Sequence, residues 1–266
     1  MKKFIIVLFI VISLIIGFSF YFINYNNKTE QKCIIKKYNL KGELLDYYES
    51  VIINKDTILN GKFINYNEKG IKISEGQFLN NEPYGNCIFY DKNGIIEKKY
   101  FRKNSKIDLE CTYYNKNGIL NRYIACNEND IPFYVIQYDK IGVTRSSGLL
   151  QVELFQHELD KHLYNKDEFV KYIQKKKEYK VGDKIKCRFI YPNIPNAKKS
   201  YSIEIENSSK KFKLNNIKYS KPFFYDIEEK IQYKGKNTIL SIVKYEFNDK
   251  VTPVFIDTLK FDIYAN

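Results

Sequence analysis

The residues that come nearest to a catalytic motif are His157-Glu158-Leu159-Asp160-Lys161-His162. Metalloproteases hold zinc with two histidines at positions i and i+4 of a helix, beside a glutamate. Here the histidines are five positions apart, which separates them by roughly 140° around a helix and puts them on opposite faces of a strand. The chain has 2 His in all, so there is no third imidazole. We therefore predict surface histidines and no metal site.

The sequence also lacks motifs for nucleophilic catalysis and for nucleotide binding. The sequence contains no G-x-S-x-G elbow, no P-loop and no G-x-G-x-x-G fingerprint. The acidic pair Glu228-Glu229 is followed directly by Lys230 and indicates a solvated loop. We expect no catalytic residue and no cofactor. A hydrolase of envelope polymers stays open as an alternative, because two carboxylates can meet in any fold.

The chain is organised around a repeat. Five tags share a Tyr, an Asn or Asp, two further residues and a Gly, and their tyrosines are 28, 24, 24 and 24 positions apart. The tags are Tyr38-Asn39-Leu40-Lys41-Gly42, Tyr66-Asn67-Glu68-Lys69-Gly70, Tyr90-Asp91-Lys92-Asn93-Gly94, Tyr114-Asn115-Lys116-Asn117-Gly118 and Tyr138-Asp139-Lys140-Ile141-Gly142. A fixed period of this size is typical of a repeat array, in which each unit contacts mainly its neighbours.

Each full unit predicts one β-hairpin. The Asn/Asp-x-x-Gly tag supplies the positive φ that a tight turn needs. Runs between the tags, such as Ile71 to Leu79, are rich in β-branched and aromatic residues, which is typical of strands. We expect an elongated antiparallel meander over residues 38–150. Its predicted turn glycines are Gly42, Gly70, Gly94, Gly118 and Gly142.

The stretch from Gly76 to Gly94 resembles the bacterial, antitoxin-like variant of the MORN repeat. That family reads Gly, aromatic, a polar turn, Gly, aromatic and then Tyr-x-x-Asn-Gly. Here Gly76, Phe78, Asn80-Asn81-Glu82, Gly85 and Tyr90-Asp91-Lys92-Asn93-Gly94 follow in that order. The resemblance covers residues 38–148 and departs from the pattern at 114–137, where Phe133 stands in the phase of the second Gly. It implies a binding or scaffolding module, or an antitoxin-like protein, and brings no catalytic residue.

The aromatic residues of the array predict a binding face. A hairpin ribbon has two faces, and in-phase side chains form rows along them. The candidates are Phe78, Tyr90, Tyr100, Tyr114 and Tyr138. Such a face suits a protein or an envelope polymer, whereas cross-strand packing that holds the array together is the alternative.

The chain is basic, with a net charge of +13 from 44 Lys and Arg against 31 Asp and Glu. A basic surface attracts acidic partners. These positive residues are mostly Lys and are spread along the chain, whereas nucleic-acid readers cluster them and use Arg. We therefore expect no nucleic-acid partner.

The five cysteines include no C-x-x-C pair. Cys87 and Cys111 hold the same phase in successive hairpins, so they lie two strands, or roughly 9.5 Å, apart. This exceeds the Cα separation of ~7 Å that a disulfide tolerates. We predict mostly buried free thiols.

Residues 1–24 predict a signal anchor or a signal peptide. Lys2 and Lys3 precede an uncharged apolar run, Phe4 to Ile23, which is long enough to span a hydrocarbon core of ~30 Å. The positive end stays inside. We therefore expect an inner-membrane protein with its bulk outside the cytoplasm, periplasmic or exported if the signal is cleaved at Gly17-Phe18-Ser19. Residues 25–37 predict a spacer.

The last part of the chain loses the period. Residues 151–178 predict a connector, with a short amphipathic helix at 166–177. Residues 179–266 predict about seven short strands, typical of an immunoglobulin-type sandwich, and they are loosely similar to Ig-like domains of bacterial envelope proteins.

The sequence thus predicts an all-β protein in which an N-terminal transmembrane or signal helix precedes a hairpin array and a C-terminal β-sandwich. Its expected function is non-catalytic: a membrane-anchored binding or scaffolding protein of the cell envelope, with an unidentified protein or polymer as partner. An antitoxin or immunity protein that neutralises a toxin by binding it is the alternative.

Overall fold

The computed structural model describes residues 30–155, 179–207, 211–214, 217–220 and 222–266. These residues form eighteen strands and no helix. The predicted all-β fold is confirmed for this part of the chain. A search of the same residues finds no helix that is long and apolar enough to cross a membrane. The predicted N-terminal helix, the helix at 166–177 and both histidines lie outside the described residues.

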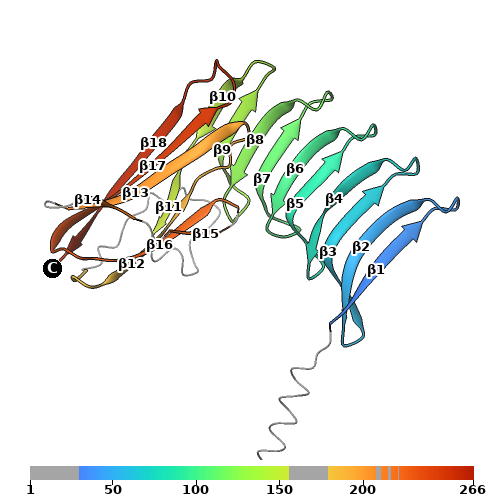
Figure 1. Cartoon of the computed structure of the whole chain (residues 1–266), viewed down its shortest axis with the longest axis horizontal. Coiled ribbons are helices and arrows are strands. Elements are labelled where there is room, and N and C mark those ends of the chain that lie inside the picture. Colours follow the sequence, from blue (N-terminus) through green and yellow to red (C-terminus); the bar gives the residue numbers. More distant parts are fainter. Residues whose placement is uncertain (1–29, 156–178, 208–210, 215–216, 221) are drawn as a thin grey trace, which may run out of the picture. The chain divides into compact units, whose positions relative to one another are not determined.

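The first ten strands form one antiparallel sheet in chain order, with short turns between them (Figure 1). They are β1 (Gln31–Tyr38), β2 (Leu44–Ile53), β3 (Asp56–Tyr66), β4 (Lys72–Leu79), β5 (Glu82–Tyr90), β6 (Ile96–Arg102), β7 (Asp108–Tyr114), β8 (Leu120–Cys126), β9 (Pro132–Tyr138) and β10 (Val143–Gly148). The predicted hairpin array is therefore present as a long antiparallel hairpin sheet. The chain divides into two compact units, residues 1–84 and 85–266, and each is described by itself.

The first four tags form the same turn. At the second tag the Gly70 N–H donates to the Asn67 carbonyl at 2.9 Å, and the Asn67 N–H donates to the Ile71 carbonyl at 2.9 Å. The Asn67 side-chain oxygen accepts from the N–H groups of Lys69 and Ile71 at 2.9 and 3.0 Å. Gly70 has a φ of 72°, so the loop is a type I turn completed by a left-handed residue in a G1 bulge. The other three turns repeat these bonds and the positive φ of their glycine.

The turns at the other ends of the hairpins use asparagine and aspartate for the same purpose. Asn80 and Asn81 have φ values of 54° and 68°, as a two-residue type I′ turn requires. Between β8 and β9, Asp130 has a φ of 62° and donates its N–H to the Asn127 carbonyl at 3.1 Å. Short polar side chains tolerate the left-handed region better than other side chains, so glycine is not needed at these positions.

The remaining eight strands form two four-stranded sheets. Their strands are β11 (Val152–Phe155), β12 (Lys184–Ile190), β13 (Ala197–Asn207), β14 (Lys211–Lys213), β15 (Ile217–Ser220), β16 (Phe224–Lys230), β17 (Gly235–Phe247) and β18 (Phe255–Ala265). The sheet orders are β11-β12-β16-β15 and β14-β13-β17-β18. Along β12, exposed Lys184 and Lys186 alternate with buried Ile185 and Cys187, which gives the sheet one solvated and one packed face.

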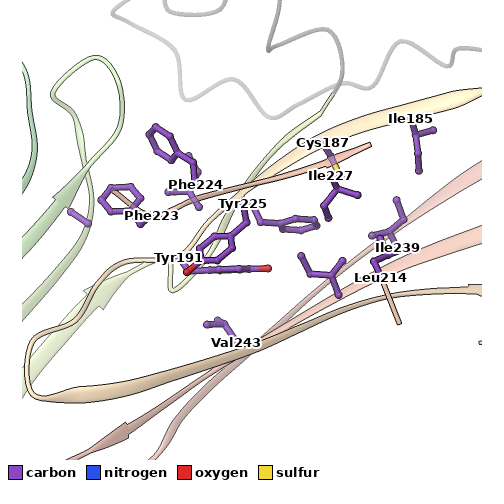
Figure 2. Packing of buried hydrophobic residues seen from close by; sticks show 14 of the residues in the cluster. Ile185, Cys187, Tyr191, Leu214, Phe223, Phe224, Tyr225, Ile227, Ile239 and Val243 are labelled. Atoms are coloured by element: carbon purple, nitrogen blue, oxygen red, sulfur yellow. The ribbon is translucent and has the colours of Figure 1, made fainter. Parts of the chain in front are cut away.

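The packed faces of the two sheets share one core. Figure 2 shows Ile185 and Tyr225 of one sheet beside Ile239 and Val243 of the other, and all four are buried. The same cluster takes in buried residues of β8 and β9, namely Tyr123, Ala125, Tyr134 and Ile136. Since burying one large apolar side chain contributes ~1.5–3 kcal/mol, this shared core joins the end of the array to the two sheets.

The fifth tag departs from the first four. Gly142 has no left-handed φ, so the expectation that every tag glycine supplies one is wrong here. A Cβ at Gly142 would lie 2.7 Å from Thr252 Oγ1 and 3.0 Å from Val251 Cγ2 in the β17–β18 loop. The next residue, Val143, donates its N–H to Thr252 Oγ1 at 3.0 Å. The lack of a side chain at Gly142 leaves room for the β17–β18 loop to pack against it.

Two element boundaries differ from the predicted domain boundaries. Residues 31–37, which the sequence placed in a spacer, belong to β1. Residues 152–155, which the sequence placed in the connector, form β11 and pair with β12. Both segments are short and carry no turn tag, so only their pairing partners identify them as strands.

The cysteines follow the prediction in four positions. Cys87, Cys111, Cys126 and Cys187 are buried thiols outside any disulfide, whereas Cys33 is half-buried. Burial raises the pKa of the Cys111 and Cys126 thiols to about 12, and thiols that stay protonated are poor nucleophiles.

Candidate binding surface on the repeat sheet

The predicted aromatic residues do not share one face of the sheet. Lys98 and Lys99 are neighbours in β6 and therefore point to opposite faces. The Lys98 Nζ lies 5.9 Å from the ring centroid of Tyr100, whereas the Lys99 Nζ lies 5.3 Å from that of Tyr114. Tyr100 and Tyr114 thus lie on opposite faces.

The other three predicted residues, Phe78, Tyr90 and Tyr138, lie in three different environments. The Tyr138 hydroxyl donates to the Pro195 carbonyl at 3.0 Å, so this ring faces the two four-stranded sheets. Tyr90 is half-buried at the end of β5. Phe78 belongs to the first unit, where its ring centroid lies 4.9 Å from that of Phe63. None of the five belongs to the row of residues described next, but Tyr100 lies on the same face of the sheet as Lys98, which does.

One residue from each of six successive strands, β5 to β10, forms a line on the face of Tyr100. Directly opposite residues of antiparallel strands lie on the same face, and the register pairs these six in succession. They are Phe89, Lys98, Tyr113, Arg122, Gln137 and Arg145, which we call the cation–aromatic row. All six belong to the second unit.

The aromatic rings of the row hold its cations. The Arg122 Cζ lies 4.7 Å from the Tyr113 centroid, and the Lys98 Nζ lies 5.4 Å from the Phe89 centroid. Such contacts contribute ~0.5–1 kcal/mol when they are exposed. A ring face fixes the position of a cation without using up its N–H donors, which remain able to bind an external anion. Gln137 and Arg145 are exposed.

The charge of the row is not neutralised by carboxylates. Among the described residues, no Asp or Glu forms a salt bridge with Lys98, Arg122 or Arg145. The nearby Arg102, in contrast, is paired with Asp108 at 2.9 Å. The row therefore carries three positive charges that no carboxylate of the described residues neutralises; Arg145 is exposed, and Lys98 and Arg122 are half-buried.

A second basic surface is partly neutralised by carboxylates. A groove of about 930 Å³ lies over β12, β15 and β16 and is lined by both lysines and carboxylates. There the Lys184 Nζ lies 2.5 Å from Glu228 Oε1, and the Arg188 Nε lies 2.6 Å from Asp226 Oδ1. Because three of its five cations, Lys184, Lys186 and Arg188, already have carboxylate partners, this groove is a weaker anion site than the row.

A buried polar cluster lies on the face of the sheet opposite to the row. Glu110 of β7 accepts from the Tyr123 hydroxyl at 2.5 Å and from the Asn193 side-chain amide at 3.3 Å. Asn193 in turn accepts from the Lys199 Nζ at 2.6 Å through Oδ1. Burial is the largest influence on the pKa of Glu110 and raises it, although the hydrogen bonds from Tyr123 and Asn193 act in the opposite direction. The cluster binds the array to β13 and to the segment that precedes it.

Lys199 makes this junction sensitive to pH. Burial lowers the pKa of Lys199 to about 8, below the value of ~10.4 in an unfolded chain. Between these values the unfolded chain binds more protons, so stability rises with pH. Relative to Lys199→Met, the wild-type free energy of unfolding should increase by ~1.5 kcal/mol between pH 8 and pH 9.5. Urea unfolding of both proteins at these pH values measures it; parallel pH profiles would contradict it.

Part of the row repeats in the sequence, in a pattern that the aromatic residues predicted for the binding face did not include. Arg122 follows Lys98 by one 24-residue period, and Tyr113 follows Phe89 by the same interval. Two successive units therefore repeat an aromatic residue and a cation at the same positions. Only the register places the aromatic of one strand directly opposite the cation of the next.

The fold and surface define an all-β protein with a ten-stranded hairpin sheet and a row of cations that form no salt bridge within the part of the chain that the structure describes. No known family model, curated protein or solved structure matches this chain.

Proposed function

We propose that this chain is a non-catalytic binding or scaffolding protein of the cell envelope. In this proposal residues 1–24 anchor it in the membrane, and the hairpin array, similar to the MORN variant, displays a binding surface outside the cytoplasm. The observation that carries the proposal is the cation–aromatic row, with three cations held by rings or exposed and none neutralised by a carboxylate of the described residues.

The architecture supports this role. The row occupies one face of the sheet, while Tyr123 and Glu110, on the opposite face, hold the junction to the two four-stranded sheets. The junction keeps β7 to β9 in fixed geometry, so the row is a pre-ordered surface. Pre-ordering reduces the entropy lost on binding. In the proposal the two sheets, an Ig-like sandwich, act as a spacer or second site.

Location is the first test. A C-terminally tagged chain should be recovered in the membrane fraction, and protease should degrade it in spheroplasts but not in inside-out vesicles. Recovery of the tagged chain in the soluble cytoplasm would overturn the envelope proposal and favour the antitoxin alternative.

Partner capture is the second test. A photo-crosslinking amino acid at Gln137, an exposed position within the row, should yield an adduct in intact cells. The same amino acid at Thr258, an exposed position on β18, is the matched control. Equal adducts from both positions would contradict a binding role for the row.

A further inference from the structure

We propose that the cation–aromatic row binds a linear acidic glycan that carries one carboxylate on every second sugar. This inference rests on the proposed function and names the partner of the same surface. It follows from the row's direction, the spacing of its charges and the kinds of side chain between them.

The row runs across the strands on one face of the sheet. Its residues occupy successive strands, β5 to β10, and neighbouring strands lie ~4.8 Å apart, so the row is ~24 Å long. Gln137 and Arg145, at one end of the row, are exposed. An open, extended track suits a chain molecule that can run along it, whereas a compact ligand needs a concave site.

The cations are evenly spaced along this track. Lys98, Arg122 and Arg145 lie on β6, β8 and β10, which places their backbones ~9.6 Å apart. A carboxylate on every second sugar of an extended glycan recurs at a comparable distance, about one disaccharide. One strand of a nucleic acid carries a charge every ~3.4 Å, so most of its phosphates would find no partner on the row.

The residues between the cations also suit sugars. Tyr113 and Gln137 alternate with Lys98, Arg122 and Arg145 along the track. An aromatic ring packs against the apolar face of a sugar ring, and a side-chain amide can both donate to and accept from sugar hydroxyls. Arginine binds a carboxylate through two parallel N–H donors, so Arg122 and Arg145 match the proposed acidic groups.

Binding should be measured with the full chain purified in detergent and with three immobilised probes. Hyaluronan has a carboxylate on every second sugar, dextran is neutral, and oligothymidylate is a denser polyanion. We expect hyaluronan to bind more tightly than oligothymidylate at equal charge concentration, and dextran not to bind. Since about three cations take part, the slope of log affinity against log salt should be no steeper than about −2.

Two triple variants distinguish binding by the row from a nonspecific effect of net charge. Lys98→Gln with Arg122→Gln and Arg145→Gln should weaken hyaluronan binding about 30-fold. The matched control replaces three cations that already form ion pairs, Lys184→Gln, Lys186→Gln and Lys236→Gln, and should change affinity less than about 3-fold.

A single position tests the positioning role of the ring. Tyr113→Phe keeps the ring under Arg122 and should bind as the wild type does, whereas Tyr113→Leu removes it and should weaken binding about 3-fold. Circular dichroism and urea unfolding of each variant show whether it folds.

Several results would overturn the inference. They are equal losses in the two triple variants, tighter binding of oligothymidylate than of hyaluronan, binding to dextran, or a salt slope much steeper than that of three contacts. If Gln137 captures an envelope protein while hyaluronan fails to bind, the glycan inference is wrong and the proposed function stands. If the chain is cytoplasmic, the proposed function fails whatever the glycan result.

Discussion

Replacing Gly148 with alanine is expected to lower the free energy of unfolding by ~3 kcal/mol, the sum of backbone strain and overpacking. A Cβ at this position would lie 2.2 Å from the Phe133 carbonyl oxygen and 2.9 Å from the Tyr134 Cα. Both atoms belong to the backbone of β9, so neither can rotate away. Gly148 also has a φ of 99°, which L side chains rarely adopt. Urea unfolding at constant pH measures the change.

Gly182 provides the matched control for that substitution. It has a φ of 95°, and a Cβ there would meet no atom within 4 Å. Gly182→Ala therefore tests the backbone conformation alone and should cost ~1–2 kcal/mol. If Gly148→Ala were no more destabilising than Gly182→Ala, the close approach of β9 to Gly148 would have no energetic consequence.

Replacing Asn193 with alanine is expected to cost ~3 kcal/mol of stability, because it removes one hydrogen-bond partner from each of two charged groups at the junction, Glu110 and Lys199. The Asn193 Nδ2 donates to Glu110 Oε2 at 3.3 Å and to the Pro222 carbonyl at 2.7 Å, and its Oδ1 accepts from the Lys199 Nζ at 2.6 Å. Alanine removes all three bonds, so the Asn193 side chain no longer links the Glu110 carboxylate to the Lys199 ammonium group. Chemical denaturation monitored by tyrosine fluorescence measures the loss.

Asn237 is the control for the loss of a buried amide between neutral partners. It is buried and donates through Nδ2 to the carbonyls of Tyr233 and Gly235 at 2.9 and 3.2 Å. Asn237→Ala should cost only ~1 kcal/mol, since no charge is left behind. Equal losses for the two alanine variants would show that the charges of Glu110 and Lys199 add nothing to the junction.

The sequence predicted the turns of the array better than its faces. Each tag contains its own turn chemistry: the Asn67 side chain bonds to Lys69 and Ile71, which are local neighbours. The faces depend on register, and the register shifts at the tag tyrosines, for example between Tyr113 and Tyr114. Because adjacent residues of a strand also lie on opposite faces, the positions of the aromatic residues in the sequence did not identify a single face.

The candidate surface and the junction also differ in how much of each could be predicted from the sequence. The 24-residue period relates the aromatic residue and the cation of two successive units, so part of the row was accessible from the sequence. The bond between Glu110 and Asn193 joins residues 83 positions apart, and no local pattern encodes it. Gly142 and Thr252 are also far apart in the sequence, so the sequence indicated only a turn role for this glycine.

The contact between Gly142 and the β17–β18 loop determines where this protein can change its length. Duplication of one 24-residue unit upstream of the fifth tag would add two strands, ~9.6 Å of sheet and one further aromatic and cation. The fifth tag is already covered by Thr252 and Val251, so insertion after it would break that contact. Gene duplication could thus lengthen the array from one end only, and each added unit would raise its valency for a repeating partner.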